Sequence, residues 1–287
     1  MPVTTRSDLV IPEILADAVA GAWPGKIALL GSEAVIESNT LPNSVRGGDT
    51  IKVPYFNVFG DLQTVAEGTP LTPVSISMTS ETATVKHAGS LHQITTWAQM
   101  AANYADPYGE ISRQLIEAAK RKFDEELLNA ANATTPSSGQ ISVNRDTGTI
   151  TYDALVDAVT AFNDEMNTTR LAVLHSKVFT DLLKLKDTTG RPLINTDNNT
   201  INCGPISVPY ILSDRAPVIT GTPNKYVTLL VRRGALALWY NQVPEVKTDY
   251  DISTDSYLLG IHIYFAAHRY QRLPGSAVAG VVRLITQ

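Results

Sequence analysis

The chain has 287 residues, 44% hydrophobic and 18% charged, which is the composition of an ordinary globular protein with a lightly charged surface. Its formal net charge of -5 argues against a nucleic-acid binder that depends on global positive charge. The single cysteine, Cys203, excludes an internal disulfide framework. The sequence shows no signal-peptide pattern and no apolar run of membrane-spanning length, so we expect a soluble intracellular product.

Residues 1–45 are predicted to form an N-terminal arm. Residues 12–19 (PEILADAV) allow a short helix that begins at a proline, and the following GAWPG ends it. The rest of this segment is apolar only in patches and has no sustained period. We therefore do not expect the arm to pack a core of its own.

The next segment, residues 46–95, predicts an extended β-hairpin. Residues 49–60 (DTIKVPYFNVFG) alternate β-branched and aromatic residues, and residues 75–95 are rich in Ser, Thr and Val, so both read as strands. The residues between them are too many for a tight turn. Because a two-stranded ribbon is marginal in water, we expect it to lie on another surface, such as a second subunit.

Residues 106–132 carry the longest uninterrupted helix pattern of the chain. Its predicted apolar stripe consists of Ile111, Leu115, Ala119, Phe123, Leu127 and Ala130. Charged residues such as Asp124 fall between them, and Asp106 followed by Pro107 is a suitable start. We expect a rod of about 40 Å that serves as a spine for the fold. Trp97, Met100 and Tyr104, just upstream, are expected to pack along its start.

The C-terminal half contains two kinds of sequence pattern. Residues 150–240 alternate helix and strand patterns and predict a small α/β domain. Residues 241–287 are rich in strands, which have few partners near them in sequence. The obvious surface for these last strands to cover is the spine helix.

Residues with catalytic or metal-binding chemistry do not form a recognisable site. His262 and His268 would share a strand face but lie about 20 Å apart, and His87 and His92 would point to opposite faces. Cys203 has no base at a readable spacing and is expected to be a small buried thiol. We therefore predict no catalytic, cofactor-binding or metal-binding residues, no cofactor and no enzymatic activity.

Two charged segments also lack the features of a binding site. Residues 249–255 alternate acidic side chains like a calcium loop, but Thr254 replaces the required glycine and Gly260 the bidentate glutamate. The short basic clusters at residues 120–122 and 232–233 are best interpreted as solvated faces or ion-pair partners. Neither pattern supports a functional assignment.

The ordered set of elements, by contrast, resembles a known family over nearly the whole chain. The segments that carry the resemblance are 47–73 (GGDTIKVPYFNVFGDLQTVAEGTPLTP), 106–132 (DPYGEISRQLIEAAKRKFDEELLNAAN), 175–194 (HSKVFTDLLKLKDTTGRPLI), 203–217 (CGPISVPYILSDRAP) and 245–284. They resemble the extended loop, spine helix, axial segment and returning strands of the major capsid proteins of tailed bacteriophages. This family has the Hong Kong 97-type fold, which encapsulin shells also use.

The resemblance implies an α+β protein with the domain organisation of that fold. The N-terminal arm would span residues 1–45 and the extended loop residues 46–95. The peripheral domain, with the spine helix at 106–132, would combine residues 96–149 and 241–287. The α/β axial domain would span residues 150–240.

The implied function is that of a structural subunit that assembles into pentamers and hexamers of an icosahedral shell around a phage double-stranded DNA genome. The alternative left open is the shell of an encapsulin-type compartment. The implied partners are further copies of the chain, a separate scaffolding protein and a portal, with a decoration protein left open, and the DNA would be enclosed without sequence-specific binding. The expected location is the virion, after assembly in the host cytoplasm. Some relatives cross-link their subunits through a lysine, but no motif around Lys52 or Lys86 transfers that chemistry.

Overall fold

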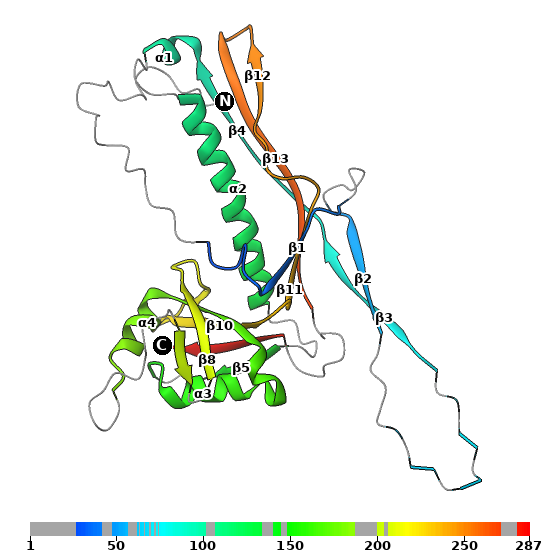
Figure 1. Cartoon of the computed structure of the whole chain (residues 1–287). Helices are drawn as coiled ribbons and strands as arrows, with labels where there is room; N and C mark the ends of the chain where they lie inside the picture. Colours follow the sequence, from blue (N-terminus) through cyan, green and yellow to red (C-terminus); the bar gives the residue numbers. More distant parts are fainter. Residues whose placement is uncertain are drawn as a thin grey trace.

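The computed structural model describes residues 27–41, 48–56, 75–101, 107–133, 140–144, 148–186, 200–203, 206–270 and 280–287, with isolated positions between 62 and 73. Figure 1 shows a long helix lying across one sheet, a second sheet with short helices at one end of that helix, and a hairpin that projects away from both. Of the predicted arm, residues 1–45, the structure describes only residues 27–41; residues 1–26 and 42–45 lie outside the described residues.

The described strands form three sheets. The five-stranded sheet contains β1 (Val35–Ser38), β4 (Lys86–Thr95), β11 (Leu236–Tyr240), β12 (Lys247–Asp251) and β13 (Ser256–Arg269). The seven-stranded sheet contains β5 (Gln140–Asn144), β6 (Thr169–Leu174), β7 (Thr200–Cys203), β8 (Ile206–Leu212), β9 (Val218–Ile219), β10 (Lys225–Arg232) and β14 (Val281–Thr286). The two-stranded sheet, the hairpin, contains β2 (Thr50–Phe56) and β3 (Met78–Thr84).

The described helices are α1 (Thr96–Ala101), α2 (Pro107–Asn132), α3 (Tyr152–Thr160) and α4 (Ser176–Leu183), with a 3₁₀ turn, η3, at Asn163–Thr168. The N-terminus of α3 is capped by Thr151, whose side chain accepts a hydrogen bond from the Ala154 N–H, as its position before the apolar pattern predicts. None of the described helices has the length and apolar composition needed to cross a membrane.

The fourteen-residue strand β13 organises the five-stranded sheet. One edge of β13 pairs antiparallel with β4 over residues 256–265. The other edge pairs with β12 at residues 256–260 and with β11 at residues 265–269. The short strand β1 then adds in parallel to β11. The sheet therefore depends on segments that lie far apart in the sequence.

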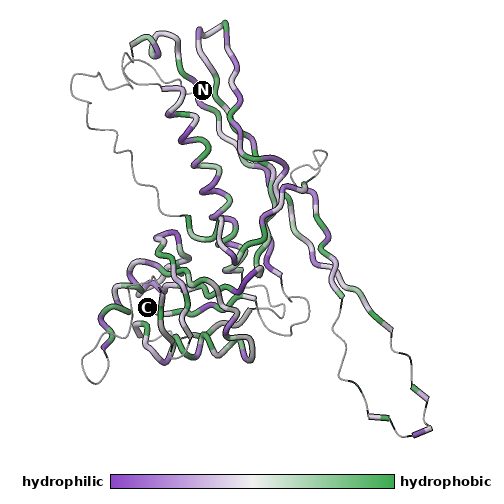
Figure 2. Tube along the Cα trace, in the orientation of Figure 1, coloured by the Kyte–Doolittle hydropathy of each residue, from purple (hydrophilic) through white to green (hydrophobic). Residues whose placement is uncertain are grey.

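The spine helix α2 begins at Pro107 and ends at Asn132, which confirms the predicted helix. Its hydrophilic and hydrophobic residues alternate turn by turn (Figure 2). Leu115, Ala119, Phe123 and Leu127 of the predicted stripe are buried, and the Phe123 ring meets Phe265 of β13 edge to face at 5.1 Å between ring centroids. A second set of residues is also buried at the C-terminal end, namely Asp124, Glu126, Leu128 and Ala131. There α2 is covered on more than one side, so its buried surface is wider than a single stripe.

The seven-stranded sheet is buried on both faces, because its central strands are apolar at successive positions. On β10, Val227, Leu229 and Val231 face the core shared with α2, whereas Leu230 faces a second core beneath α3 and α4. The neighbouring strand β14 divides in the same way, with Val281 in the first core. Continuous apolar runs of this kind are typical of strands covered on both faces.

Three strands lie in a different sheet from the one that the sequence predicted. The strand β14 was expected beside the other strands of residues 241–287, but it pairs with β10 and β5 in the seven-stranded sheet, and one of its faces still lies in the core shared with α2. All six of its residues are buried, and the central position gives them two covered faces. Conversely, β11 of the 150–240 segment and β4 of the predicted extended loop both belong to the sheet that covers α2.

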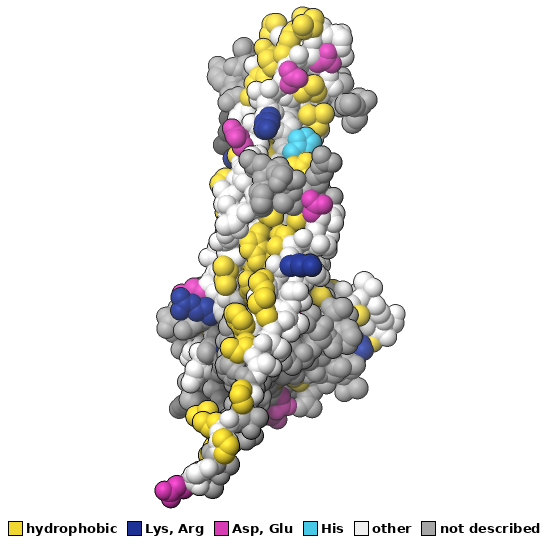
Figure 3. Space-filling model, turned by 90° about the vertical axis from the view of Figure 1, so that its right-hand side faces the viewer, with side chains coloured by type: hydrophobic (Ala, Val, Ile, Leu, Met, Phe, Trp, Pro, Cys, Tyr) yellow, Lys and Arg dark blue, Asp and Glu magenta, His cyan; other side chains and the backbone are white. Residues whose placement is uncertain are grey.

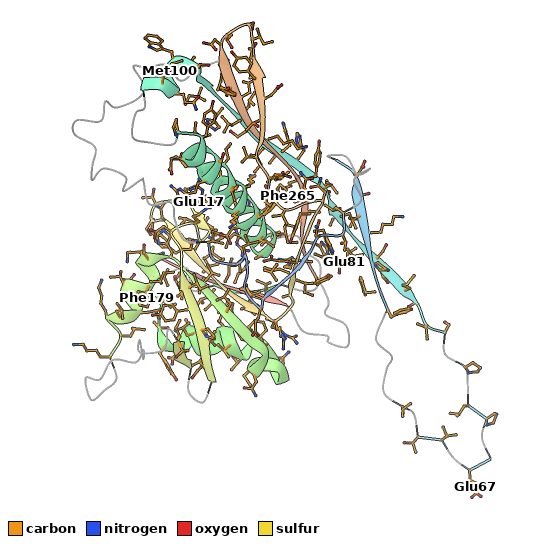
Figure 4. All side chains as sticks on the ribbon, turned by 45° about the horizontal axis from the view of Figure 1, so that its top comes forward. Glu67, Glu81, Met100, Glu117, Phe179 and Phe265 are labelled. Atoms are coloured by element: carbon orange, nitrogen blue, oxygen red, sulfur yellow. The ribbon has the colours of Figure 1, made fainter. Side chains whose placement is uncertain are left out.

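The expected packing of Trp97 and Met100 on the spine is wrong. Trp97 and Met100 are 62% and 68% exposed, because α1 contacts the rest of the chain through the buried Ala98 and turns its larger side chains outward. Figure 4 shows Met100 on the short helix α1 at the upper end of the molecule. Tyr104 lies outside the described residues.

Candidate assembly site: the hairpin and its base

The hairpin β2–β3 carries an apolar pair on its exposed face. Phe56 and Met78 lie opposite each other at its far end, and they are 67% and 62% exposed. The strands project away from both larger sheets (Figure 1), so neither sheet covers this pair. This face thus exposes large hydrophobic side chains to solvent. Their exposure does not contribute to the stability of a monomer.

Described positions beyond the two strands extend this apolar surface. The exposed hydrophobic residues there are Leu62, Val65, Leu71 and Ile76. In Figure 3 hydrophobic side chains form a row along the face of the molecule that carries the hairpin. Together with Phe56 and Met78 these residues define what we call the hairpin surface.

The base of the hairpin is attached to the five-stranded sheet. Alternation along β3 turns Glu81 and Ala83 inward, and Ala83 packs with Leu41, Val85 and Ala266 in a small apolar cluster. Glu81 Oε2 lies 2.7 Å from His268 Nε2 on β13. Both residues are buried, at 8% and 9% exposure. Figure 4 places Glu81 on the side of the hairpin strand that faces the body.

Beside this attachment a shallow cleft holds an ion-pair cluster. The cleft is lined by residues 48, 85–88, 122, 126 and 264–265. Lys86 Nζ of β4 lies 2.5 Å from Glu126 Oε2 of α2, and Lys122 Nζ lies 3.2 Å from Glu126 Oε1. Burial by itself raises the pKa of Glu126, but hydrogen bonds from the two lysines outweigh it and leave that pKa below its ordinary value. The cluster ties the start of β4 to the spine.

Two histidines that the sequence placed apart meet in the structure. His87 Nε2 of β4 lies 3.2 Å from His262 Nδ1 of β13, and the His87 ring stacks on Tyr264 at 4.5 Å between centroids. The register pairs His262 with Gly89, and a Cβ at Gly89 would lie 2.7 Å from His262 Nδ1. Histidine spacing within one strand carries no information about this contact, because it depends on the pairing of two strands.

The remaining predicted positions do not come together. His92 bonds to the hydroxyl of Ser90, and the side chain of Cys203 is not described. Asp251 accepts hydrogen bonds from its own turn, including one from the Ser253 N–H at 2.9 Å. In the described part of the chain, no three His, Cys, Asp or Glu residues are placed to hold a metal ion. Among the residues that the structure describes, these groups therefore do not form a metal site.

Arg232 does not lie on a solvated face, which was one of the two interpretations of its basic cluster. It is only 7% exposed, and burial lowers the pKa of its guanidinium. Its neighbour Arg233 does lie at the surface, near Glu33. The two arginines differ because Arg232 is the last residue of β10, which is buried on both faces, whereas Arg233 lies in the exposed turn that follows.

Asp124 is the buried anchor that sequence reasoning missed. Its carboxylate accepts backbone hydrogen bonds from Leu29 at 2.7 Å, Ala28 at 3.1 Å and Leu30 at 3.3 Å, and it is 0% exposed. It thereby fixes the segment that leads into β1. A charged residue between apolar ones on a helix normally indicates a solvent-facing position, so the sequence pattern gave no sign that Asp124 is buried.

Comparison with known proteins supports the predicted fold. The chain is similar to the capsid protein of an empty GTA particle, with a TM-score of 0.68, 12% identity and coverage of 94% of this chain and 93% of that one. It is similar to a protein of Microbacterium phage Oxtober96, with a TM-score of 0.66, 16% identity and 99% coverage of both chains. The capsid protein of Myoviridae phage XM1 gives a TM-score of 0.63 at 14% identity, covering 100% of this chain and 99% of that one. These likenesses confirm an α+β chain with the Hong Kong 97-type capsid fold.

The family is shown by the sequence itself. None of the curated proteins matches the chain. The model of a phage capsid protein family, however, matches residues 79–273, which is more than half of the chain. The match favours a phage capsid over the encapsulin shell that the sequence left open. The chain therefore belongs to this family of phage capsid proteins and is a structural subunit of a phage shell.

Proposed function

We propose that the chain assembles with copies of itself into pentamers and hexamers, and that these form an icosahedral shell around a phage double-stranded DNA genome. The family and the capsid structures support self-assembly into a capsid, with the virion as its location. The family is structural, which supports a role without catalysis. Assembly would take place in the host cytoplasm.

The observation that carries the proposal is the hairpin surface. A two-stranded ribbon that exposes Phe56 and Met78 is poorly stabilised in isolation, and both side chains gain about 1.5–3 kcal/mol each when a partner buries them. A neighbouring copy of the chain supplies that partner in a closed shell. The hairpin is then a clamp between subunits.

The test replaces the exposed pair with polar residues. Phe56→Ser with Met78→Ser should leave the melting temperature of the subunit almost unchanged, because both side chains are exposed, yet shells should no longer be visible by electron microscopy. The matched control is Lys52→Ser with Thr82→Ser, a cross-strand pair on the same face nearer the base. Normal shells from the first variant would refute the clamp.

The domain organisation is a further part of the proposal. An arm at residues 1–45, an extended loop within 46–95, a peripheral domain from 96–149 and 241–287, and an axial domain at 150–240 agree with the order of elements. The sheets suggest two adjustments to these limits, since β4 and β11 belong with α2 and β14 belongs with the axial strands. We therefore place the base of the extended loop near Val85.

The remaining partners follow from the capsid role. A scaffolding protein and a portal would be separate chains, and a decoration protein is an open option. With a net charge of -5, the chain would enclose DNA by confinement and not by sequence-specific binding.

A further inference from the structure

We propose that Glu81 and His268 are positioning residues, and that the hydrogen bond between them sets the direction in which the hairpin leaves the body of the subunit. The pair joins β3 to β13 across 187 positions of sequence. The consequence for shell assembly rests on the function proposed above, but the positioning itself does not.

The hairpin has a natural pivot at its base. Only Val85 separates β3 from β4, yet β4 belongs to the five-stranded sheet and β3 pairs only with β2 among the described strands. The bonds from the Gly48 N–H to the Val85 carbonyl and from the Val85 N–H to the Asp49 carbonyl join the two sides of the ribbon to each other. They do not fix its angle to the five-stranded sheet.

Apolar contacts at the base of the hairpin are too non-directional to fix that angle. The buried members of the cluster nearest the pivot are Leu41, Ala83, Val85 and Ala266, and the partly buried Ile51, Trp239 and Tyr264 pack against them. Hydrophobic burial is non-directional, whereas a hydrogen bond weakens steeply when its distance or angle departs from the optimum. The contact between Glu81 and His268 therefore restricts the angle of the ribbon more than the cluster does.

Glu81 and His268 are both suited to form a directional hydrogen bond. A carboxylate can only accept, so the proton lies on His268 Nε2 and is donated to Glu81 Oε2. The Trp239 ring stacks beside the imidazole at 6.1 Å between centroids with an interplanar angle of 28°, and the Tyr270 ring meets the imidazole edge to face at 5.5 Å. The two aromatic rings hold the imidazole in place, so that β13 presents a fixed donor.

Leverage turns this small contact into a large displacement. At strand rise, Glu81 lies about 13 Å from the pivot and the Phe56–Met78 end about 23 Å from it. A shift of about 1 Å at Glu81 thus moves the exposed pair by about 2 Å, which is enough to misplace a side chain in a packed interface. The direction of the hairpin decides where its apolar end meets a neighbour.

Distance measurement between spin labels tests the proposal on unassembled subunits. Labels are attached at Ser80→Cys on the exposed face of β3 and Lys120→Cys on the exposed side of α2, in a Cys203→Ser background. We expect one narrow distance distribution in this protein and its loss in Glu81→Ala. Glu81→Gln should keep the narrow distribution, because its amide oxygen still accepts from His268, and so should Thr82→Ala, an exposed change on the same strand.

The controls separate positioning from folding and from assembly. If Glu81→Ala melts early, Glu81→Leu with His268→Phe keeps the volume of the pair while removing the bond, and it must lose the narrow distribution as well. A narrow distribution in either variant, or a broad one in Glu81→Gln, overturns the proposal. Broad distributions together with normal shells would support the positioning role and refute only the clamp.

Discussion

Replacing Asp124 with alanine should destabilise the subunit by about 3–5 kcal/mol, because three backbone N–H groups lose a charged acceptor at once. The N–H groups of Ala28, Leu29 and Leu30 lie 3.1, 2.7 and 3.3 Å from the Asp124 Oδ1 atom. Ala28 and Leu29 are almost fully buried, at 1% and 0% exposure, so water cannot easily take the place of the carboxylate. A hydrogen bond to a charged group contributes about 1.5–3 kcal/mol, and partial relaxation of the segment keeps the total below the sum of three.

Urea denaturation and hydrogen exchange together measure this effect. The free energy of unfolding should fall in Asp124→Ala and less in Asp124→Asn, which keeps one oxygen acceptor but no charge. Exchange should rise across residues 28–38, since β1 follows directly on the anchored segment. Lys120→Ala, an exposed change on the same helix, is the control. A loss below about 1 kcal/mol, with unchanged protection of residues 28–30, would refute the anchoring role of Asp124.

Three further predictions follow from burial and charge. Phe123→Ala should cost about 3–5 kcal/mol in urea denaturation, whereas Trp97→Ala should stay within about 1 kcal/mol, and equal losses would contradict the placement of α1. Lys86→Met should raise the pKa of Glu126 in an NMR titration. Because the pKa of Glu126 is lowered in the folded protein, the stabilisation from its carboxylate is present above the unfolded-state pKa and is lost as the pH falls through the folded-state pKa. This loss of stability at acid pH should be smaller in Lys86→Met. Free subunits should show no measurable affinity for duplex DNA at physiological salt, and a salt-sensitive micromolar complex would disprove confinement without binding.

The sequence alone determined the local elements of this protein. The period of apolar residues predicted α2 to within one residue at its start, and β-branched composition predicted strands around residues 49–60 and 75–95. Such patterns depend only on neighbours within a turn or a strand, so they can be read without knowing the partners. The order of these elements was also specific enough to indicate the capsid family.

Tertiary structure decided which elements meet and which polar groups are buried. The pairing of β14 with β10, the anchoring of residues 28–30 by Asp124 and the bond between Glu81 and His268 all join segments that lie far apart in the chain. A period identifies the buried side of an element but not the partner that covers it, so Trp97 was expected inside and Asp124 outside. Contacts of this kind depend on the whole packed arrangement, and for that reason only the structure revealed the base of the hairpin.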